Sequence, residues 1–438
     1  SATCSTSRSA TTTRPEADSS RRRRSSRGVP VWTCNGWRRT VRGMSLLVTA
    51  HHMLSADGSS LLEGHALLVD GSRIVRVGPE TTLSPHAGAR LDLGDATVMP
   101  GFVDAHTHVS VRPGDGDQHG QLARPTAWLA LRGAKNLEAM VASGVTTARI
   151  MGEPGGIDLA AKALIDAGDL VGPRLRVAGS ALSATHGHGV ALGVADGVEG
   201  VRAAVRRNVA AGADHVKIFM TGGVSSFTGG LYDHHYGREE VRAVVEEAHR
   251  VGRRVAAHAH GGPGVTICAE EGVDSIEHGS LLTDENVDAI VRYGTSLVLT
   301  KSIAHHPDGI ERGDASNPVV LEKLRAAREA DRAAFERVRA SGLPYAVGTD
   351  GMHGYLGEEI VWLVDQGVPV AEAFGAATWE GARVLQEVPD VGRLHAGYRA
   401  DVIALGGDAF ASPHEAVRSV RMVMQEGRVR IGPEPVRT

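Results

Sequence analysis

Two histidines, two residues apart at the end of an apolar segment, are the first residues in the chain whose types and spacing could do chemistry. His106 and His108 follow the apolar stretch 98–103. Side chains at positions i and i+2 of a strand point to the same face, so both imidazoles can reach one metal ion. The spacing therefore predicts a metal site at the end of a strand.

Four further apolar segments contain or end in residues that bind metals or transfer protons: Lys217, His258, His278 and Asp350. The lysine stands out because the chain has only five lysines among its 47 Lys and Arg residues, and this one lies inside an apolar segment. Each residue alone could have an ordinary structural role; Asp350, for instance, could cap the helix that follows it. Together they indicate one site to which several segments contribute.

The elements that must position these residues alternate between strands and helices. Candidate strands lie at 98–106, 145–151, 175–179, 215–219, 254–258, 275–277, 296–300 and 344–347. Helical patterns occupy 126–143, 200–212, 238–251 and 317–341. This order predicts an α/β fold, a (β/α)8 TIM barrel over 99–387, in which catalytic groups lie at the carboxyl ends of the strands. An open doubly wound sheet is the alternative, but no glycine-rich dinucleotide-binding motif follows the first strand.

Short strands dominate both ends of the remaining sequence, at 46–48, 66–69, 74–77, 400–405 and 417–423. We expect residues 44–98 and 388–435 to form one small β-sandwich domain built from both ends of the chain. Residues 1–43 carry ten arginines against two acidic residues, a formal charge of +8. Because this stretch is rich in Ser and Arg and poor in apolar residues, we expect a disordered basic extension.

Composition excludes several classes of protein. The 438 residues are 42% hydrophobic, enough for a sizeable core, yet no run reaches the roughly 20 apolar residues that span a bilayer. Three cysteines provide no disulfide framework, and 4% aromatic residues argue against a stacking surface for single-stranded nucleic acid. We expect a cytoplasmic homo-oligomer that acts on a small molecule and binds neither nucleic acid nor membranes.

The segment 98–108, Val-Met-Pro-Gly-Phe-Val-Asp-Ala-His-Thr-His, resembles the first-strand motif of the amidohydrolase superfamily. The order His-x-His, Lys, His, His, Asp resembles the branch of that superfamily with two metals and a carboxylated lysine. Within this branch, the imidazolonepropionase-like and Xaa-Pro dipeptidase (prolidase)-like group is similar at 145–147, 172–174, 276–279 and 397–401. The resemblance covers about 44–429.

The resemblance implies a site for two divalent metal ions. His106, His108 and Asp350 would hold one ion. His258 and His278 would hold the other. Zinc is the metal expected at a histidine-rich site, with manganese, cobalt and iron as alternatives.

The resemblance also implies that Lys217, carboxylated by CO2, bridges the two metals. Only a neutral amine can form the carbamate, and burial beside cations lowers a lysine pKa in the required direction. The two metals would make hydroxide available near neutral pH and polarise the scissile carbonyl. Asp350 would take the proton from the bridging water and pass it to the departing amine.

Three further residues are expected to contact the substrate. His260 lies two residues after His258 and faces the same side, so it could polarise the substrate carbonyl. His188 ends a glycine-rich loop after the third strand, and Tyr232 lies in the loop after the fourth. We expect His188 and His260 to take part in catalysis as well as in binding.

Three hypotheses for the function follow. The first is hydrolysis of an amide bond in a dipeptide or N-acyl amino acid. The second is hydrolysis of a cyclic amide such as an imidazolone, or deamination of a heterocycle, although deaminases of the superfamily usually use one metal and no bridging lysine. The third is an inactive scaffold, which the six filled ligand positions oppose. About two metals per chain would favour the first hypothesis, one would favour deamination, and none would favour the scaffold.

Overall fold

The computed structural model describes residues 45–226, 229–387 and 389–437. The basic segment 1–43 lies outside the described residues. Within the described part of the chain, no helix is long and apolar enough to cross a membrane.

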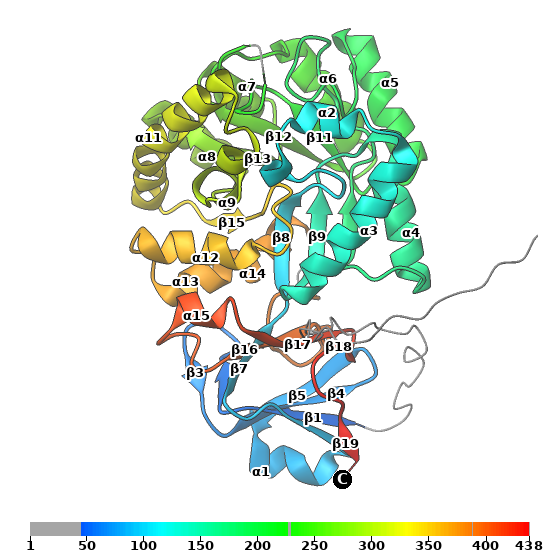
Figure 1. Ribbon diagram of the computed structural model, residues 1–438, viewed down its shortest axis with the longest axis vertical. Coiled ribbons are helices and arrows are strands. Elements are labelled where there is room, and N and C mark those ends of the chain that lie inside the picture. Colours follow the sequence, from blue (N-terminus) through cyan, green and yellow to red (C-terminus); the bar gives the residue numbers. More distant parts are fainter. Residues whose placement is uncertain (1–44, 227–228, 388, 438) are drawn as a thin grey trace, which may run out of the picture. The chain divides into compact units, whose positions relative to one another are not determined.

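Eight parallel strands, arranged in two sheets, form the centre of the molecule (Figure 1). The first sheet has the order β10-β9-β8 and comprises β8 (Phe102–Thr107), β9 (Val145–Ile150) and β10 (Arg174–Val177). The second has the order β11-β12-β13-β14-β15. It comprises β11 (His215–Phe219), β12 (Arg254–Gly261), β13 (Ser275–Leu281), β14 (Ser296–Leu299) and β15 (Tyr345–Val347). Every pairing within the two sheets is parallel, as helical crossovers require.

Backbone hydrogen bonds also join the two sheets at both of their outer edges. On one side, Leu182, which follows β10, donates to the carbonyl of Lys217 at 2.8 Å and accepts from Phe219 at 2.9 Å. On the other side, the amide of Asp350, after β15, donates to the carbonyl of His106 at 2.8 Å. The carboxyl ends of the first and last strands therefore lie against each other.

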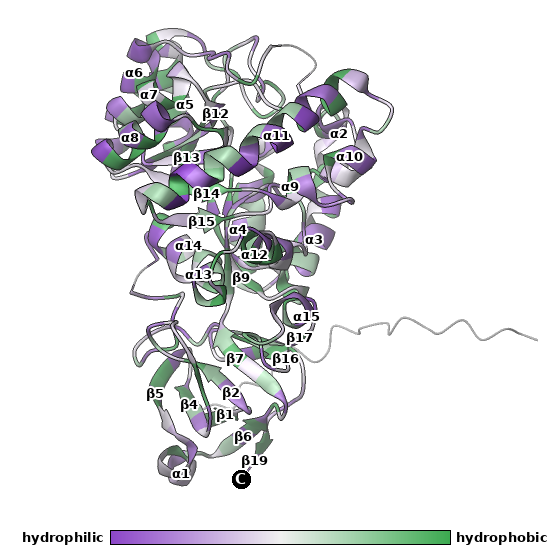
Figure 2. Ribbon diagram, turned by 90° about the vertical axis from the view of Figure 1, so that its left-hand side faces the viewer, coloured by the Kyte–Doolittle hydropathy of each residue, from purple (hydrophilic) through white to green (hydrophobic). Residues whose placement is uncertain are grey.

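Helices cover the outer side of these strands. The longer ones are α3 (Thr126–Ala142), α4 (Ile157–Ala167), α5 (Gly197–Ala210), α6 (Arg238–His249), α7 (Pro263–Glu270), α8 (Asp284–Tyr293), α11 (Pro318–Ser341) and α12 (Leu356–Asp365). The shorter ones are α2 (Gln118–Leu122), α9 (Ser302–His305), α10 (Ile310–Gly313), α13 (Val370–Ala376) and α14 (Trp379–Val384). Along α11, hydrophobic and hydrophilic residues follow one another in bands (Figure 2), as expected for a helix with one buried side.

The predicted first strand, 98–106, is in fact two strands that belong to different sheets. β7 (Ala96–Pro100) and β8 are separated at Gly101, where the chain crosses from one sheet to the other. A Cβ atom at Gly101 would lie 2.2 Å from Thr146 Oγ1, so only glycine allows this close approach. The continuous apolar pattern hides this break because both strands are buried.

Two mixed sheets contain strands from both ends of the described chain. One has the order β19-β6-β1-β4-β5, with β1 (Leu46–Thr49), β4 (His65–Asp70), β5 (Arg73–Pro79), β6 (Ala89–Asp92) and β19 (Val436–Arg437). The other has the order β18-β17-β16-β7-β2-β3, with β2 (His52–Leu54), β3 (Leu61–Leu62), β16 (Val402–Gly406), β17 (Val420–Gln425) and β18 (Arg428–Ile431). Two short helices, α1 (Glu80–Leu83) and α15 (Pro413–Ala416), accompany these sheets. The boundaries of a separate domain, 44–98 with 388–435, stay a prediction.

A buried ion pair joins these sheets to the parallel strands. Arg174 Nη1, at the start of β10, lies 2.7 Å from Asp401 Oδ2, and the Asp401 side chain is 2% exposed. Asp401 also accepts the backbone amide of Glu426 at 2.8 Å through Oδ1, and its carbonyl accepts the amide of Gly101 at 2.9 Å. Asp401, in the motif 397–401, thus fixes the main chain at Gly101, where the chain crosses from one sheet to the other.

We expect Asp401→Ala to lower the free energy of unfolding by about 3 kcal/mol, because it leaves the guanidinium of Arg174 buried without its main partner. Denaturant unfolding measures this loss. Glu138→Ala is the control, since it breaks the exposed pair between Lys135 and Glu138 and should cost less than about 1 kcal/mol. Equal losses in the two variants would contradict a structural role for the Asp401 pair.

Candidate metal centre and active site

A cavity at the carboxyl ends of the parallel strands gathers most of the predicted site residues. Its lining includes five predicted metal ligands, His106, His108, His258, His278 and Asp350. It also includes His188 and His260, the two histidines predicted to contact substrate. Residues that lie far apart in the sequence therefore meet in one place, as the parallel arrangement of the strands requires.

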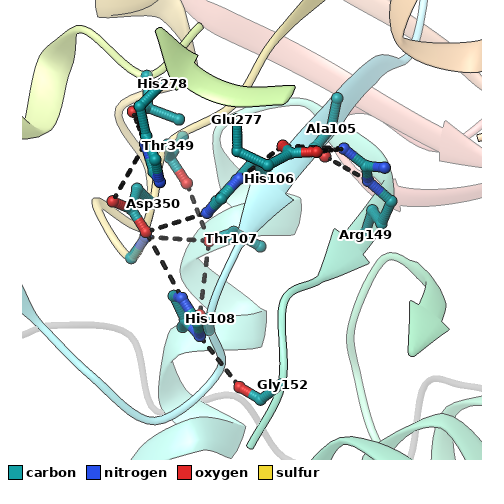
Figure 3. A network of polar contacts seen from close by, with 12 residues as sticks. Ala105, His106, Thr107, His108, Arg149, Gly152, Glu277, His278, Thr349 and Asp350 are labelled. Carbon is teal, nitrogen blue, oxygen red and sulfur yellow. Dashed lines mark hydrogen bonds and ion pairs between the residues drawn. The ribbon is translucent and has the colours of Figure 1, made fainter. Parts of the chain in front are cut away.

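The carboxylate of Asp350 lies among three imidazoles (Figure 3). Its Oδ1 is 3.3 Å from His106 Nε2 and 3.5 Å from His108 Nε2. Its Oδ2 is 3.9 Å from His278 Nδ1. Burial alone would raise the pKa of Asp350, but the hydrogen bond and charge of His106 outweigh it and hold the pKa below its usual range. The carboxylate is therefore ionised and able to accept a proton or bind a cation.

Among the described residues, His106, His278 and Asp350 form a potential metal site. One ligand atom from each lies within 4.8 Å of the others. The family resemblance places His278 at a different ion from His106 and Asp350. In the structure, however, ligand atoms of all three residues lie close together. Which ligand binds which of the two ions therefore stays a prediction.

His258 lies on the other side of His278. The centroids of their rings are 4.5 Å apart, and the His258 ring is also 4.9 Å from that of His260 and 4.7 Å from that of His188. Burial and the neighbouring imidazoles lower the pKa of His258 well below its usual value. A neutral imidazole is the form that binds a metal.

Lys217 is fully buried in β11, and its Nζ has no hydrogen-bond partner among the described residues. Its Nζ lies 5.0 Å from the centroid of the Phe219 ring. Burial is the main cause that lowers the pKa of Lys217 to about 8. A buried amine without a partner is costly, so this position fits a lysine that carries or contacts a further group.

A chain of polar contacts that the sequence did not reveal lies beneath His106. The Nδ1 of His106 donates to Glu277 Oε2 at 2.7 Å, and Arg149 Nη2 donates to both oxygens of Glu277 at 2.8 and 3.0 Å (Figure 3). Burial would raise the pKa of Glu277, but the charge of Arg149 and the hydrogen bond from His106 lower it to about 2. This contact fixes the tautomer of His106 and leaves its Nε2 free to bind a metal.

Two other histidines are held in the same manner. His108 Nδ1 donates to the carbonyl of Gly152 at 3.0 Å, which leaves its Nε2 free on the side of Asp350. Thr300 Oγ1 lies 2.7 Å from His278 Nδ1. For the first network the sequence offers one signal, the charged Arg149 near the end of the predicted strand 145–151, but nothing in the sequence pairs it with Glu277.

The predicted substrate contacts have different surroundings. His260 Nδ1 is buried without a hydrogen-bond partner among the described residues, and burial, with the charge of Lys301, lowers its pKa to about 4. His188 Nδ1 lies 2.6 Å from Ser226 Oγ. Tyr232 is 50% exposed and is not among the described residues that line the cavity. The structure therefore brings His188 and His260, but not Tyr232, into the cavity with the predicted metal ligands.

The lining of the cavity also contains many apolar side chains. Its walls come from the loops after β8, β10, β11 and β14 and include Val111, Leu122, Leu192, Val224, Ile303 and Ile310. None of the described residues that line it is an arginine or a lysine. The lining thus combines apolar side chains with imidazoles and a few uncharged polar groups such as Ser225 and Thr300.

Residues 97–430 match the amidohydrolase family. The chain belongs to this family. The predicted resemblance is thereby confirmed, and this amidohydrolase is an enzyme of the hydrolase class that acts on C–N bonds. A TIM-barrel-like α/β fold and dependence on divalent metals are typical of the family.

Relatives of this amidohydrolase include enzymes with different named substrates. It is 32% identical over 402 residues to the ochratoxinase of Aspergillus niger, covering 82% of this chain and 80% of that protein. It is 28% identical over 407 residues to the imidazolonepropionase of Saccharopolyspora erythraea, covering 84% and 93%. Among solved structures, a Xaa-Pro dipeptidase with methionine bound in its active site is similar at 28% identity with a TM-score of 0.82, covering 89% of this chain and all of that one.

We expect Glu277→Gln to weaken metal binding by about 10–100-fold, because an amide neither balances the charge of Arg149 nor orients His106 as a carboxylate does. Competition with a chromophoric chelator measures the affinity. Glu246→Gln, on the outer side of α6, is the matched control and should leave it unchanged. Unaltered metal affinity in Glu277→Gln would contradict the proposed role of the polar chain.

Proposed function

We propose that this amidohydrolase uses two divalent metal ions, zinc by preference, to hydrolyse an amide bond in a dipeptide or a small molecule resembling an N-acyl amino acid. The observation that carries the proposal is the buried, unpartnered amine of Lys217 beside a cavity into which four histidines and one aspartate converge. We further propose that CO2 carboxylates Lys217 and that the carbamate bridges the ions.

The donor set suits this assignment. Imidazole nitrogens and a carboxylate are ordinary zinc ligands, and the low pKa values of the buried histidines keep them in the neutral form that binds metals. Ordinary lysine would leave a buried amine without a partner, whereas a carbamate is an anionic group with oxygen ligands. Two divalent ions at such a site would lower the pKa of water and polarise the substrate carbonyl.

The chain's own residues supply proton transfer and orientation. Asp350, ionised and in contact with the imidazoles of His106 and His108, would accept a proton from the attacking water and then deliver it to the leaving amine. His260 presents an unpartnered Nδ1 and would orient the substrate carbonyl. The apolar walls would exclude water from the bond that is cleaved.

A small-molecule substrate with an apolar group fits the lining, which has imidazoles and apolar side chains but no arginine or lysine among its described residues. The named substrates of the ochratoxinase and Xaa-Pro dipeptidase relatives contain amide bonds, which supports the same class here.

Three further proposals concern the fold and the assembly of the enzyme. We propose that the eight parallel strands close into a (β/α)8 barrel and that the sheets from both chain ends form a β-sandwich. We also propose that the enzyme is a homo-oligomer.

Hydrolysis of a cyclic amide is the second candidate. The similarity to an imidazolonepropionase over 84% of this chain favours it over deamination of a heterocycle, for which Lys217 would have no purpose. Assay of the metal-loaded enzyme against dipeptides, N-acyl amino acids and lactams separates the two. Turnover of the lactams alone would overturn the first proposal.

We expect Asp350→Asn to reduce kcat by about 10²–10⁴-fold while much of the metal is retained. The amide oxygen can still bind a metal, but it cannot accept a proton. Steady-state kinetics and metal analysis of the same sample test this. A variant with nearly normal turnover would exclude Asp350 as the general base.

We expect Lys217→Ala to lose metal and activity, and Lys217→Arg not to replace lysine, because a guanidinium stays protonated and cannot be carboxylated. Acetate or propionate added with zinc to Lys217→Ala should restore part of the activity by supplying oxygens in the vacated space. Acetamide is the neutral control and should not. Crystallographic density beyond Nζ tests the carbamate directly, and an unmodified amine remote from two occupied metal sites in active enzyme would contradict it.

A further inference from the structure

His278 has a backbone conformation that residues other than glycine rarely adopt. Its φ is +75°, in the left-handed region, and the only other predicted metal ligand in that region among the described residues is Asp350. Such conformations are unfavourable and persist only where the surrounding structure holds them. Something must therefore hold the main chain of His278 in place.

The main chain of His278 is paired with Ala259 of β12, and the side chain of Lys301 also contacts it. Lys301 follows β14 closely and is 1% exposed. Its Nζ donates to the carbonyl of His278 at 3.4 Å and lies 5.6 Å from the centroid of the Trp362 ring. Lys301 is not among the described residues that line the cavity.

Asp331, on α11, holds the amine of Lys301. The two side chains form an ion pair in which each is 2% exposed. Asp331 lies on the buried side of α11 together with Leu324, Ala327 and Val338, where an apolar residue would be expected. His305 Nε2 lies 2.8 Å from the second oxygen of Asp331, so both oxygens of this carboxylate have a partner.

The main chain of Lys301 is fixed as well. Glu359, fully buried on α12, accepts the amides of Lys301 at 2.7 Å and Ser302 at 2.6 Å. Both ends of the lysine are thus anchored by carboxylates from two different helices.

We propose that Lys301, held by Asp331, is a positioning residue that fixes the main chain of His278 so that its imidazole is directed at the metal site. The proposal rests on the proposed function, since it assigns His278 to metal binding. Stability alone accounts poorly for the pair, because a buried ion pair often adds little to stability compared with apolar residues of similar size. Outer contacts of metal ligands, in contrast, commonly change metal affinity by about 10–100-fold.

Two variants separate positioning from stability. Lys301→Met leaves Asp331 buried without its main partner, so both the melting temperature and the zinc affinity should fall. The double variant Lys301→Met with Asp331→Leu removes both members of the ion pair. Glu359 keeps its hydrogen bonds from the main-chain amides of residues 301 and 302, and His305, which is 25% exposed, can reach water. The double variant should therefore recover most of its melting temperature and still bind zinc about 10–100-fold more weakly than the wild type.

The affinity is measured by competition with a chromophoric chelator, and the spectrum of the Co²⁺-loaded protein reports the geometry at the metal. Val338→Ala, on the same side of α11, is the control for lost stability: its melting temperature should fall while its zinc affinity stays within twofold of the wild type. Wild-type zinc affinity and an unchanged Co²⁺ spectrum in the double variant would overturn the positioning role and leave the proposed function intact. Wild-type protein that binds no metal would overturn both.

Discussion

The contact between Asp350 and the imidazoles of the first strand is the interaction on which the arrangement of the site depends. The amide of Asp350 donates to the carbonyl of His106, and its carboxylate lies 3.3 Å from the Nε2 of the same residue. One residue therefore joins the last parallel strand to the first through its main chain and gathers the histidines through its side chain. Gly348 makes this possible, because a Cβ atom there would lie 2.4 Å from the amide nitrogen of His106.

Hydrogen bonds around this contact divide the polar residues into two layers. The inner layer consists of imidazoles whose pKa values are lowered by burial and which face Asp350 and Lys217. The outer layer is made of groups that hold those imidazoles, such as Glu277 beneath His106 and Thr300 beside His278. Under the proposed function, the reaction type would follow from the inner layer, and the loops around the cavity would determine which amide can enter.

The ends of the parallel strands were predictable from the sequence, because an apolar run marks a buried strand. A histidine, lysine or aspartate at the end of that run then lies at the carboxyl end of the strand. Each of the eight expected strands overlaps an observed strand, and five of the six predicted ligands line one cavity, with Lys217 buried beside it. The break at Gly101 was not predictable, because two buried strands in succession form one continuous apolar run. Contacts such as Arg149 with Glu277 were also hidden, since they join residues more than a hundred positions apart and no periodic pattern links them.

The pairing of β7 with β16 has a consequence for the synthesis of the chain on the ribosome. Thr97 and its partner Leu405 are separated by roughly 300 residues, which take about 15–60 s to translate at typical rates. During that interval β7 lacks one of its neighbours, and its apolar residues and unpaired backbone groups stay open to other nascent chains. The parallel strands between them can pair meanwhile, so the sheets from the two chain ends must be the last part of the protein to complete its folding.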